Sequence, residues 1–151
     1  MKTPLLTSAI ISVLALTACS QAEAPKVETV ASNASDAKTM PTKTKAVLVY
    51  ADWCTSCKVL DPKLQEVKSM GPMPGLEYVT LDYTAKDTND FYAQADAAGV
   101  GEAVKTYLNG TIITGVLLLV DVDDKQVVGK VTKTLDTKDI AKAMKEAIEV
   151  S

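Results

Sequence analysis

Two short, uninterrupted apolar runs, at residues 46–50 and 116–120, largely determine the architecture open to this chain. A strand with one solvent-facing side alternates apolar and polar residues. A continuous apolar run of this length is instead typical of a strand buried on both faces. Strands of that kind need helices on both sides of one sheet. The sequence therefore predicts an α/β domain with a central mixed sheet flanked by helices.

The segments between and after these runs complete the predicted element order, β-α-β-α-β-β-α. Leu60, Leu64 and Val67 recur with the spacing of a helix after the first run, and glycines and prolines end it at residues 71–75. We expect a strand over 76–83, a helix ending at 98, a strand over 126–131 and an amphipathic C-terminal helix. Residues 102–108 carry the pattern of one further short helix.

The first 18 residues have the layout of an export signal. Lys2 precedes an apolar run that is shorter than the roughly 20 residues needed to span a bilayer. The run ends in Leu16-Thr17-Ala18-Cys19, which resembles the bacterial lipobox. The resemblance implies that residues 1–18 are removed and that acylated Cys19 anchors the protein in the lipid bilayer. The alternative is an ordinary secretory signal cut at residues 22–24.

Residues 19–45 have the composition of a tether. Small and polar residues dominate and large apolar ones are scarce, so no core could repay the entropy of folding. We expect an acylated Cys19 with a flexible tether to residue 45, and a folded domain over 46–151. Ser20 stands where an aspartate would resemble an inner-membrane retention signal. We therefore expect a periplasm-facing lipoprotein of the bacterial cell envelope, in the outer rather than the inner membrane.

The charged residues exclude several classes of site. The chain has 16 basic residues, all of them lysine, no histidine and a formal net charge of −3. Without histidine there is no Ser-His-Asp or Cys-His nucleophile and no His-ligated zinc. No basic face collects along the chain, so we expect no nucleic acid partner.

Cys54 and Cys57 form a Cys-x-x-Cys motif where the first apolar strand gives way to a helix. A helix N-terminus carries partial positive charge and unpaired N–H groups, and both stabilise a thiolate. We expect Cys54 to be the attacking nucleophile and Cys57, one turn further, to resolve the mixed disulfide. Two other interpretations remain open. The same thiolates could bind a soft metal such as Cu(I), or the pair could be a structural disulfide in a non-catalytic binding module.

The residues around the motif resemble the thioredoxin family. Tyr50-Ala51-Asp52-Trp53-Cys54-x-x-Cys57-Lys58, followed by Pro62, is most similar within it to the C-terminal periplasmic domain of the membrane thiol:disulfide interchange reductase. The resemblance implies a thioredoxin-like fold over residues 46–151. It also implies reduction of protein disulfides, with electrons from a membrane donor and with no cofactor beyond the Cys54–Cys57 disulfide.

The same resemblance assigns supporting roles to four residues near the cysteines. It implies that Trp53 packs beside the pair and that Pro62 kinks the helix. Asp61 matches an acidic position that tunes the thiol pKa values. Lys58 contributes by its charge alone, or is an ordinary solvated lysine.

Two positions depart from the family pattern. Leu48 stands where the family usually has a buried acid that serves proton transfer at the inner thiol. Thr114 and Gly115 stand where the family has a cis-proline that faces the cysteines. In the family that loop docks the substrate backbone and shields the thiols from metals. The resemblance therefore places Thr114 and Gly115 beside the pair, without the proline.

Overall fold

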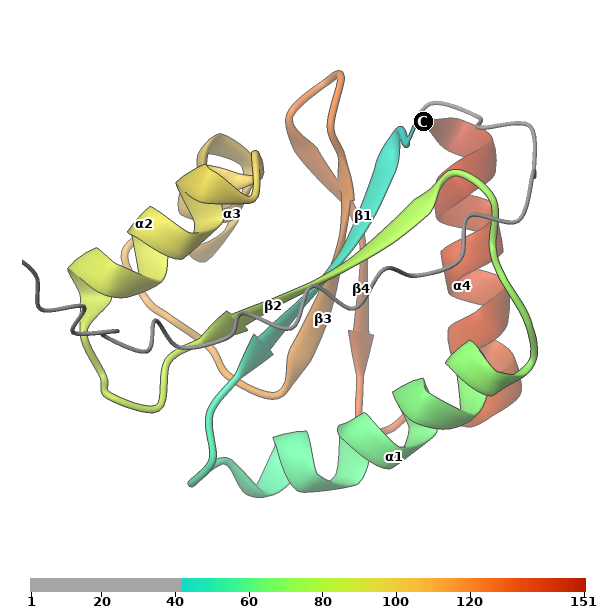
Figure 1. Cartoon of the computed structure of the whole chain (residues 1–151), viewed down its shortest axis with the longest axis horizontal. Helices are drawn as coiled ribbons and strands as arrows, with labels where there is room; N and C mark the ends of the chain where they lie inside the picture. The colour runs from blue at the N-terminus through green and yellow to red at the C-terminus, as the bar shows by residue number, and fades with distance from the viewer. Residues whose placement is uncertain (1–41) are drawn as a thin grey trace, which may run out of the picture. The chain divides into compact units, whose positions relative to one another are not determined.

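The computed structural model describes residues 42–151 (Figure 1). The predicted signal segment, Cys19 and the tether up to residue 41 lie outside the described residues. No helix within residues 42–151 is long and apolar enough to cross a membrane. The elements are β1 (Thr44–Tyr50), α1 (Thr55–Ser69), β2 (Leu76–Asp82), α2 (Thr88–Ala97), α3 (Gly101–Leu108), β3 (Val116–Asp121), β4 (Gln126–Thr132) and α4 (Thr137–Val150).

The four strands form one mixed sheet in the order β2-β1-β3-β4. β1 pairs in parallel with β2, and the other two pairings are antiparallel. The two apolar runs of the sequence thus become the two central strands, β1 and β3. Each has a neighbouring strand along both of its edges, and helices cover both faces of the sheet (Figure 1).

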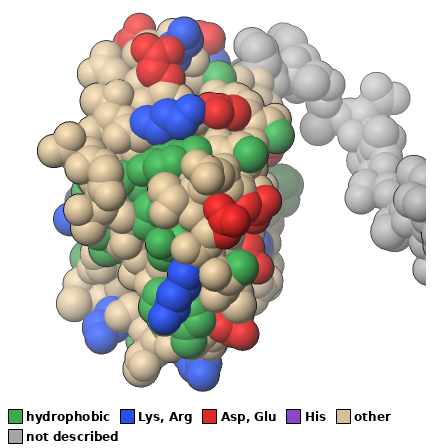
Figure 2. Space-filling model, turned by 90° about the vertical axis from the view of Figure 1, so that its left-hand side faces the viewer, with side chains coloured by type: hydrophobic (Ala, Val, Ile, Leu, Met, Phe, Trp, Pro, Cys, Tyr) green, Lys and Arg blue, Asp and Glu red, His purple; other side chains and the backbone are tan. Residues whose placement is uncertain are grey.

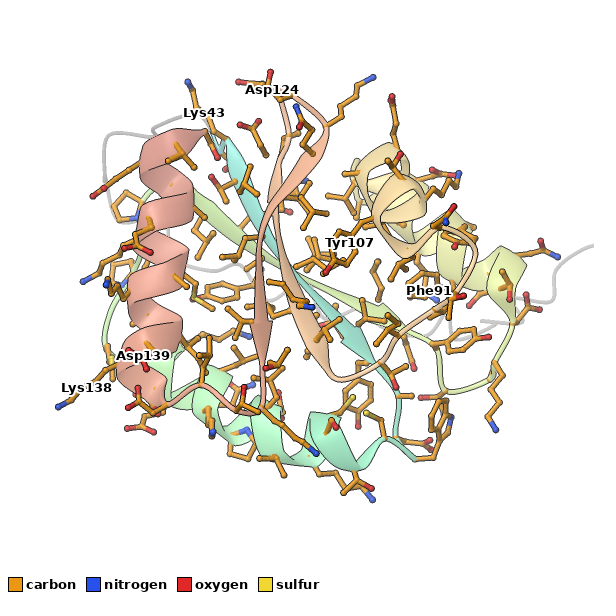
Figure 3. The ribbon with its side chains drawn as sticks, turned by 180° about the vertical axis from the view of Figure 1, so that it is seen from behind. Lys43, Phe91, Tyr107, Asp124, Lys138 and Asp139 are labelled. Carbon is orange, nitrogen blue, oxygen red and sulfur yellow. The ribbon has the colours of Figure 1, made fainter. Side chains whose placement is uncertain are left out.

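Alternate residues of the central strands enter two separate hydrophobic cores. Leu48 and Leu117 face α1 and α4, whereas Val47 and Leu118 face α2 and α3. Phe91 points from α2 toward the sheet in the second core and is fully buried (Figure 3). The predicted class, an α/β domain with a central mixed sheet flanked by helices, is confirmed.

The outward side of α2 and α3 is shown in Figure 2. Hydrophobic side chains gather along the middle of this face, between scattered lysines and carboxylates. Tyr107 of α3 is one of the large apolar residues that remain exposed in the described part of the chain. Charges of both signs are interspersed on this face.

The region before β3 holds two helices, α2 and α3, as the sequence pattern predicts. Gly99 (φ +71°) ends the first helix, and the Val100 N–H bonds back to the Ala95 carbonyl. One detail differs from the sequence prediction. β1 begins at Thr44, two residues before the apolar run. Thr44 is polar but fully buried, and its hydroxyl is hydrogen-bonded to the Ser151 side chain.

Candidate active site

The two cysteines lie where β1 gives way to α1. Cys54 is the N-cap residue of α1 and has an extended backbone conformation. Its Sγ accepts a hydrogen bond from the Cys57 N–H at 3.2 Å. A serine, threonine or aspartate oxygen usually has this role at an N-cap. The cap is therefore a sulfur, and ionising that sulfur strengthens the bond that it accepts.

Both thiols are free and sheltered from solvent. Cys54 is 6% exposed and Cys57 is fully buried, and the two pack with Ala51 in a small cluster. The Cys57 Sγ donates to the Val49 carbonyl oxygen at 3.8 Å. The inner thiol is thus directed at the backbone of β1, whereas the outer thiol retains a small opening to solvent.

The surroundings shift the pKa values of the two thiols in opposite directions. Burial raises the pKa of the Cys54 thiol, but hydrogen bonds from Cys57, from the Thr114 side chain and from the Ser56 N–H together bring it below its ordinary value. Burial, the hydrogen bond to Cys54 and the charge of Cys54 raise the pKa of Cys57 to about 11. As the pH rises, Cys54 therefore ionises before Cys57 does.

The loop before β3 contacts the cysteine pair through a glycine. The Gly115 N–H donates to the Val49 carbonyl at 2.8 Å, the same oxygen that Cys57 faces. A Cβ added to Gly115 would lie 3.1 Å from the Cys54 Sγ and 2.4 Å from the Ser56 Cβ. Gly115 also has a positive φ of +78°, which favours glycine. Only a glycine can bring this backbone so close to the thiols.

The position expected of a cis-proline is therefore occupied differently here. Between residues 42 and 151 there is no cis peptide bond. Gly115 supplies an N–H that a proline could not supply, and this N–H fastens the loop to β1. The structure thus brings the backbone of Gly115 against Cys54, with a glycine where the family pattern has a proline.

The four other predicted supporting residues lie on α1 or directly before it. Trp53 is 46% exposed and its indole Nε1 donates to the Thr84 carbonyl at 3.0 Å. Lys58 is exposed, and Pro62 lies inside α1. Asp61 accepts a hydrogen bond from Gln65 at 3.3 Å. Neither Lys58 nor Asp61 is among the groups that shift the thiol pKa values.

Sequence reasoning missed the contribution of the segment after β2. Tyr50 at the end of β1 lies opposite Asp82 at the end of β2, and Thr84 stands two residues after Asp82. The carboxyl ends of parallel strands meet at one edge of a sheet, where functional groups often gather. That rule could have drawn attention to Thr84, because both strands were predicted from the sequence.

Comparisons with known proteins give only distant likenesses. No protein-family model matches this sequence, and no curated protein does. Among solved structures, StoA from Bacillus subtilis is 11% identical, with 68% of this chain and 83% of that chain covered, at a TM-score of 0.45. Trxlp from Edwardsiella tarda EIB202 is 17% identical, with 67% and 81% covered, at a TM-score of 0.41. The function proposed below rests on the geometry of the two thiols.

Proposed function

We propose that this protein is a thiol–disulfide oxidoreductase that reduces disulfide bonds of other proteins through Cys54 and Cys57. One observation carries the proposal: two free thiols stand at the N-terminus of α1, and the pKa of the outer one is lowered while that of the inner one is raised to about 11. A purely structural pair needs no such difference. A nucleophile and a resolving thiol do.

In the first step the Cys54 thiolate attacks one sulfur of a substrate disulfide. The substrate S–S bond breaks, a new bond joins that sulfur to the Cys54 Sγ, and the second substrate sulfur leaves as a thiolate that takes up a proton. The lowered pKa of Cys54 increases the fraction of thiolate available for this attack. The 6% exposure of Cys54 gives the substrate its point of access.

In the second step Cys57 loses its proton and attacks the Cys54 Sγ. The mixed disulfide breaks, the substrate leaves fully reduced, and the protein retains the Cys54–Cys57 disulfide; two electrons have passed to the substrate. Leu48 provides no carboxylate to accept the Cys57 proton, so that proton goes to the departing substrate thiolate. A membrane-bound dithiol donor then returns two electrons to the protein.

The proposed location follows from the N-terminal sequence. The lipobox resemblance at residues 16–19 supports acylation of Cys19 and attachment to the periplasmic side of a bacterial membrane, the outer one by the Ser20 criterion. The sequence around Cys54 supports the reducing direction, because it is most similar to a reductase domain.

The test is the reduction potential of the pair in the full chain with Cys19→Ser, equilibrated against glutathione. A value near the thioredoxin end, about −270 mV, is expected, and a value near −120 mV would make the protein an oxidant instead. In the same background, Cys57→Ser should accumulate mixed disulfides with substrate proteins, whereas Cys54→Ser should not. Stoichiometric Cu(I) binding without any disulfide exchange would contradict the proposal.

A further inference from the structure

The turn that leads into Cys54 lies beside a segment from another strand. Residues 51–54 form a turn closed by a hydrogen bond from the Cys54 N–H to the Ala51 carbonyl at 3.1 Å. Since β1 and β2 are parallel, both strands end at the same edge of the sheet (Figure 1). The chain that leaves β2 therefore emerges next to this turn. The Tyr83 N–H fastens it there by donating to the Tyr50 carbonyl at 2.8 Å.

Thr84 contacts both central residues of the turn. Its Oγ1 accepts a hydrogen bond from the Asp52 N–H at 3.1 Å, and its carbonyl accepts one from the Trp53 indole at 3.0 Å. One residue thus holds the backbone of the first central residue and the side chain of the second. Cys54, the N-cap residue of α1, follows directly, so the same contacts fix the backbone that leads into it.

Thr84 is itself held in one orientation by Asp82. The Thr84 N–H donates to the Asp82 Oδ1 at 2.8 Å, and the Thr84 hydroxyl donates to the same oxygen at 2.5 Å. Because the hydroxyl hydrogen is directed at Asp82, its oxygen lone pairs are available to the Asp52 N–H. The hydroxyl therefore acts as donor and acceptor at once.

The helix α2 anchors the other end of this network. The Gln94 side chain accepts from the Asp82 N–H at 2.9 Å and donates to the Asp82 carbonyl at 3.0 Å. On the solvent side, Lys86 lies over the Trp53 ring, with its Nζ 4.9 Å from the ring centroid. Trp53 is thus fixed at its edge and covered on its face, although almost half of its surface is exposed.

We propose that Thr84 is a positioning residue for the dithiol. Its hydroxyl fixes the turn at residues 51–54. This turn then aligns the Cys54 Sγ with the first N–H groups of α1, which favour its thiolate. Thr84 touches neither sulfur. The inference rests on the proposed function only for its effect on disulfide exchange; its effects on Trp53 and on the ionisation of Cys54 are independent of any substrate.

The experiment compares Thr84→Val, Thr84→Ser and a control, Thr80→Val, in the full chain with Cys19→Ser. Thr80 is an exposed threonine of β2, the strand that ends just before Thr84, so its substitution removes a hydroxyl outside the network. Three quantities are measured in the reduced protein. The first is the anisotropy of the fluorescence emission of Trp53, which is the single tryptophan of the chain. The second is the alkylation rate of Cys54 as a function of pH, and the third is the rate of disulfide exchange.

We expect Thr84→Val to lower the Trp53 anisotropy, to raise the pKa of Cys54 and to slow its alkylation at pH 7 about threefold to tenfold, the loss typical of one hydrogen bond. Thr84→Ser should retain the parent values, and Thr80→Val should match the parent. If Thr84→Val behaves as Thr80→Val does in anisotropy and alkylation, the positioning role is wrong. If those two change as expected but the parent exchanges no disulfides, the proposed function fails and the positioning role stands.

Discussion

Gly115 approaches Cys54 so closely that a Cβ on the glycine would lie 3.1 Å from the Cys54 Sγ. The contact is made by backbone, because Gly115 donates its N–H to the Val49 carbonyl and adopts a positive φ. Thr114, whose side chain helps to lower the pKa of Cys54, directly precedes this glycine. The loop before β3 therefore contributes to the ionisation of the outer thiol through the position of one glycine.

Gly115→Ala should separate the loop from the thiols. The new methyl group would meet the Ser56 Cβ at 2.4 Å, so the loop must shift and carry the Thr114 side chain, which helps to lower the pKa of Cys54, away from the thiol. We expect the pKa of Cys54 to rise and the free energy of unfolding to fall by about 2–4 kcal/mol, from strain at positive φ together with the clash. Alkylation rates against pH and denaturant unfolding measure the two effects.

Gly110→Ala is the matched control for that substitution. Gly110 also has a positive φ, of +81°, but a Cβ there would meet no atom within 4 Å. It should therefore show only the cost of the backbone strain, about 1–2 kcal/mol, with the Cys54 pKa unchanged. An equal rise of the Cys54 pKa in both variants would show that the close contact at Gly115 has no particular effect on the thiol.

The two thiols should differ sharply in reactivity. The pKa of Cys54 is lowered and that of Cys57 is raised to about 11, so Cys54 is the more ionised of the two thiols at any given pH below 11. We expect one alkylation per reduced molecule in the Cys19→Ser chain, at Cys54, with Cys57 at least about tenfold slower. Mass spectrometry of the labelled peptides identifies the site. Labelling of Cys57 first, or of both at equal rates, would reverse the assigned roles.

The architecture could be predicted because the strongest pattern in the sequence is also the physical cause of the fold. Val47 and Leu48 are adjacent in one apolar run, and they enter different cores on opposite faces of the sheet. A strand buried on both faces has no other way to satisfy its side chains. The start of β1 was missed because Thr44 is polar, and its burial depends on a partner, Ser151, at the far end of the chain.

The site could be predicted only as far as it is local. Cys54 and Cys57 are three residues apart at a strand-to-helix junction, which the sequence displays directly. Thr84 reaches the site through strand pairing, and its contacts to Asp52 and Trp53 span 32 and 31 residues. The Val49 carbonyl is a backbone group, so no residue type identifies it as the acceptor that faces Cys57. Such contacts follow from register, which local patterns do not specify.

The buried Cys57 thiol should make the stability of the reduced protein depend on pH in the alkaline range. Its pKa is raised to about 11 in the folded protein, so the folded state holds the Cys57 proton after the unfolded chain, with an ordinary thiol pKa near 8.5, has released it. The contribution of this proton to the free energy of unfolding is complete below about pH 8.5 and is lost as the pH rises to about 11.

We expect the free energy of unfolding of the reduced Cys19→Ser chain to fall by about 2–3 kcal/mol more over this interval than that of the same chain with Cys57→Ala. Lysines and tyrosines titrate equally in both chains, so the difference between their denaturant unfolding curves reports Cys57 together with its effect on the Cys54 thiol. Parallel loss of stability in the two chains would show that burial does not raise the pKa of Cys57.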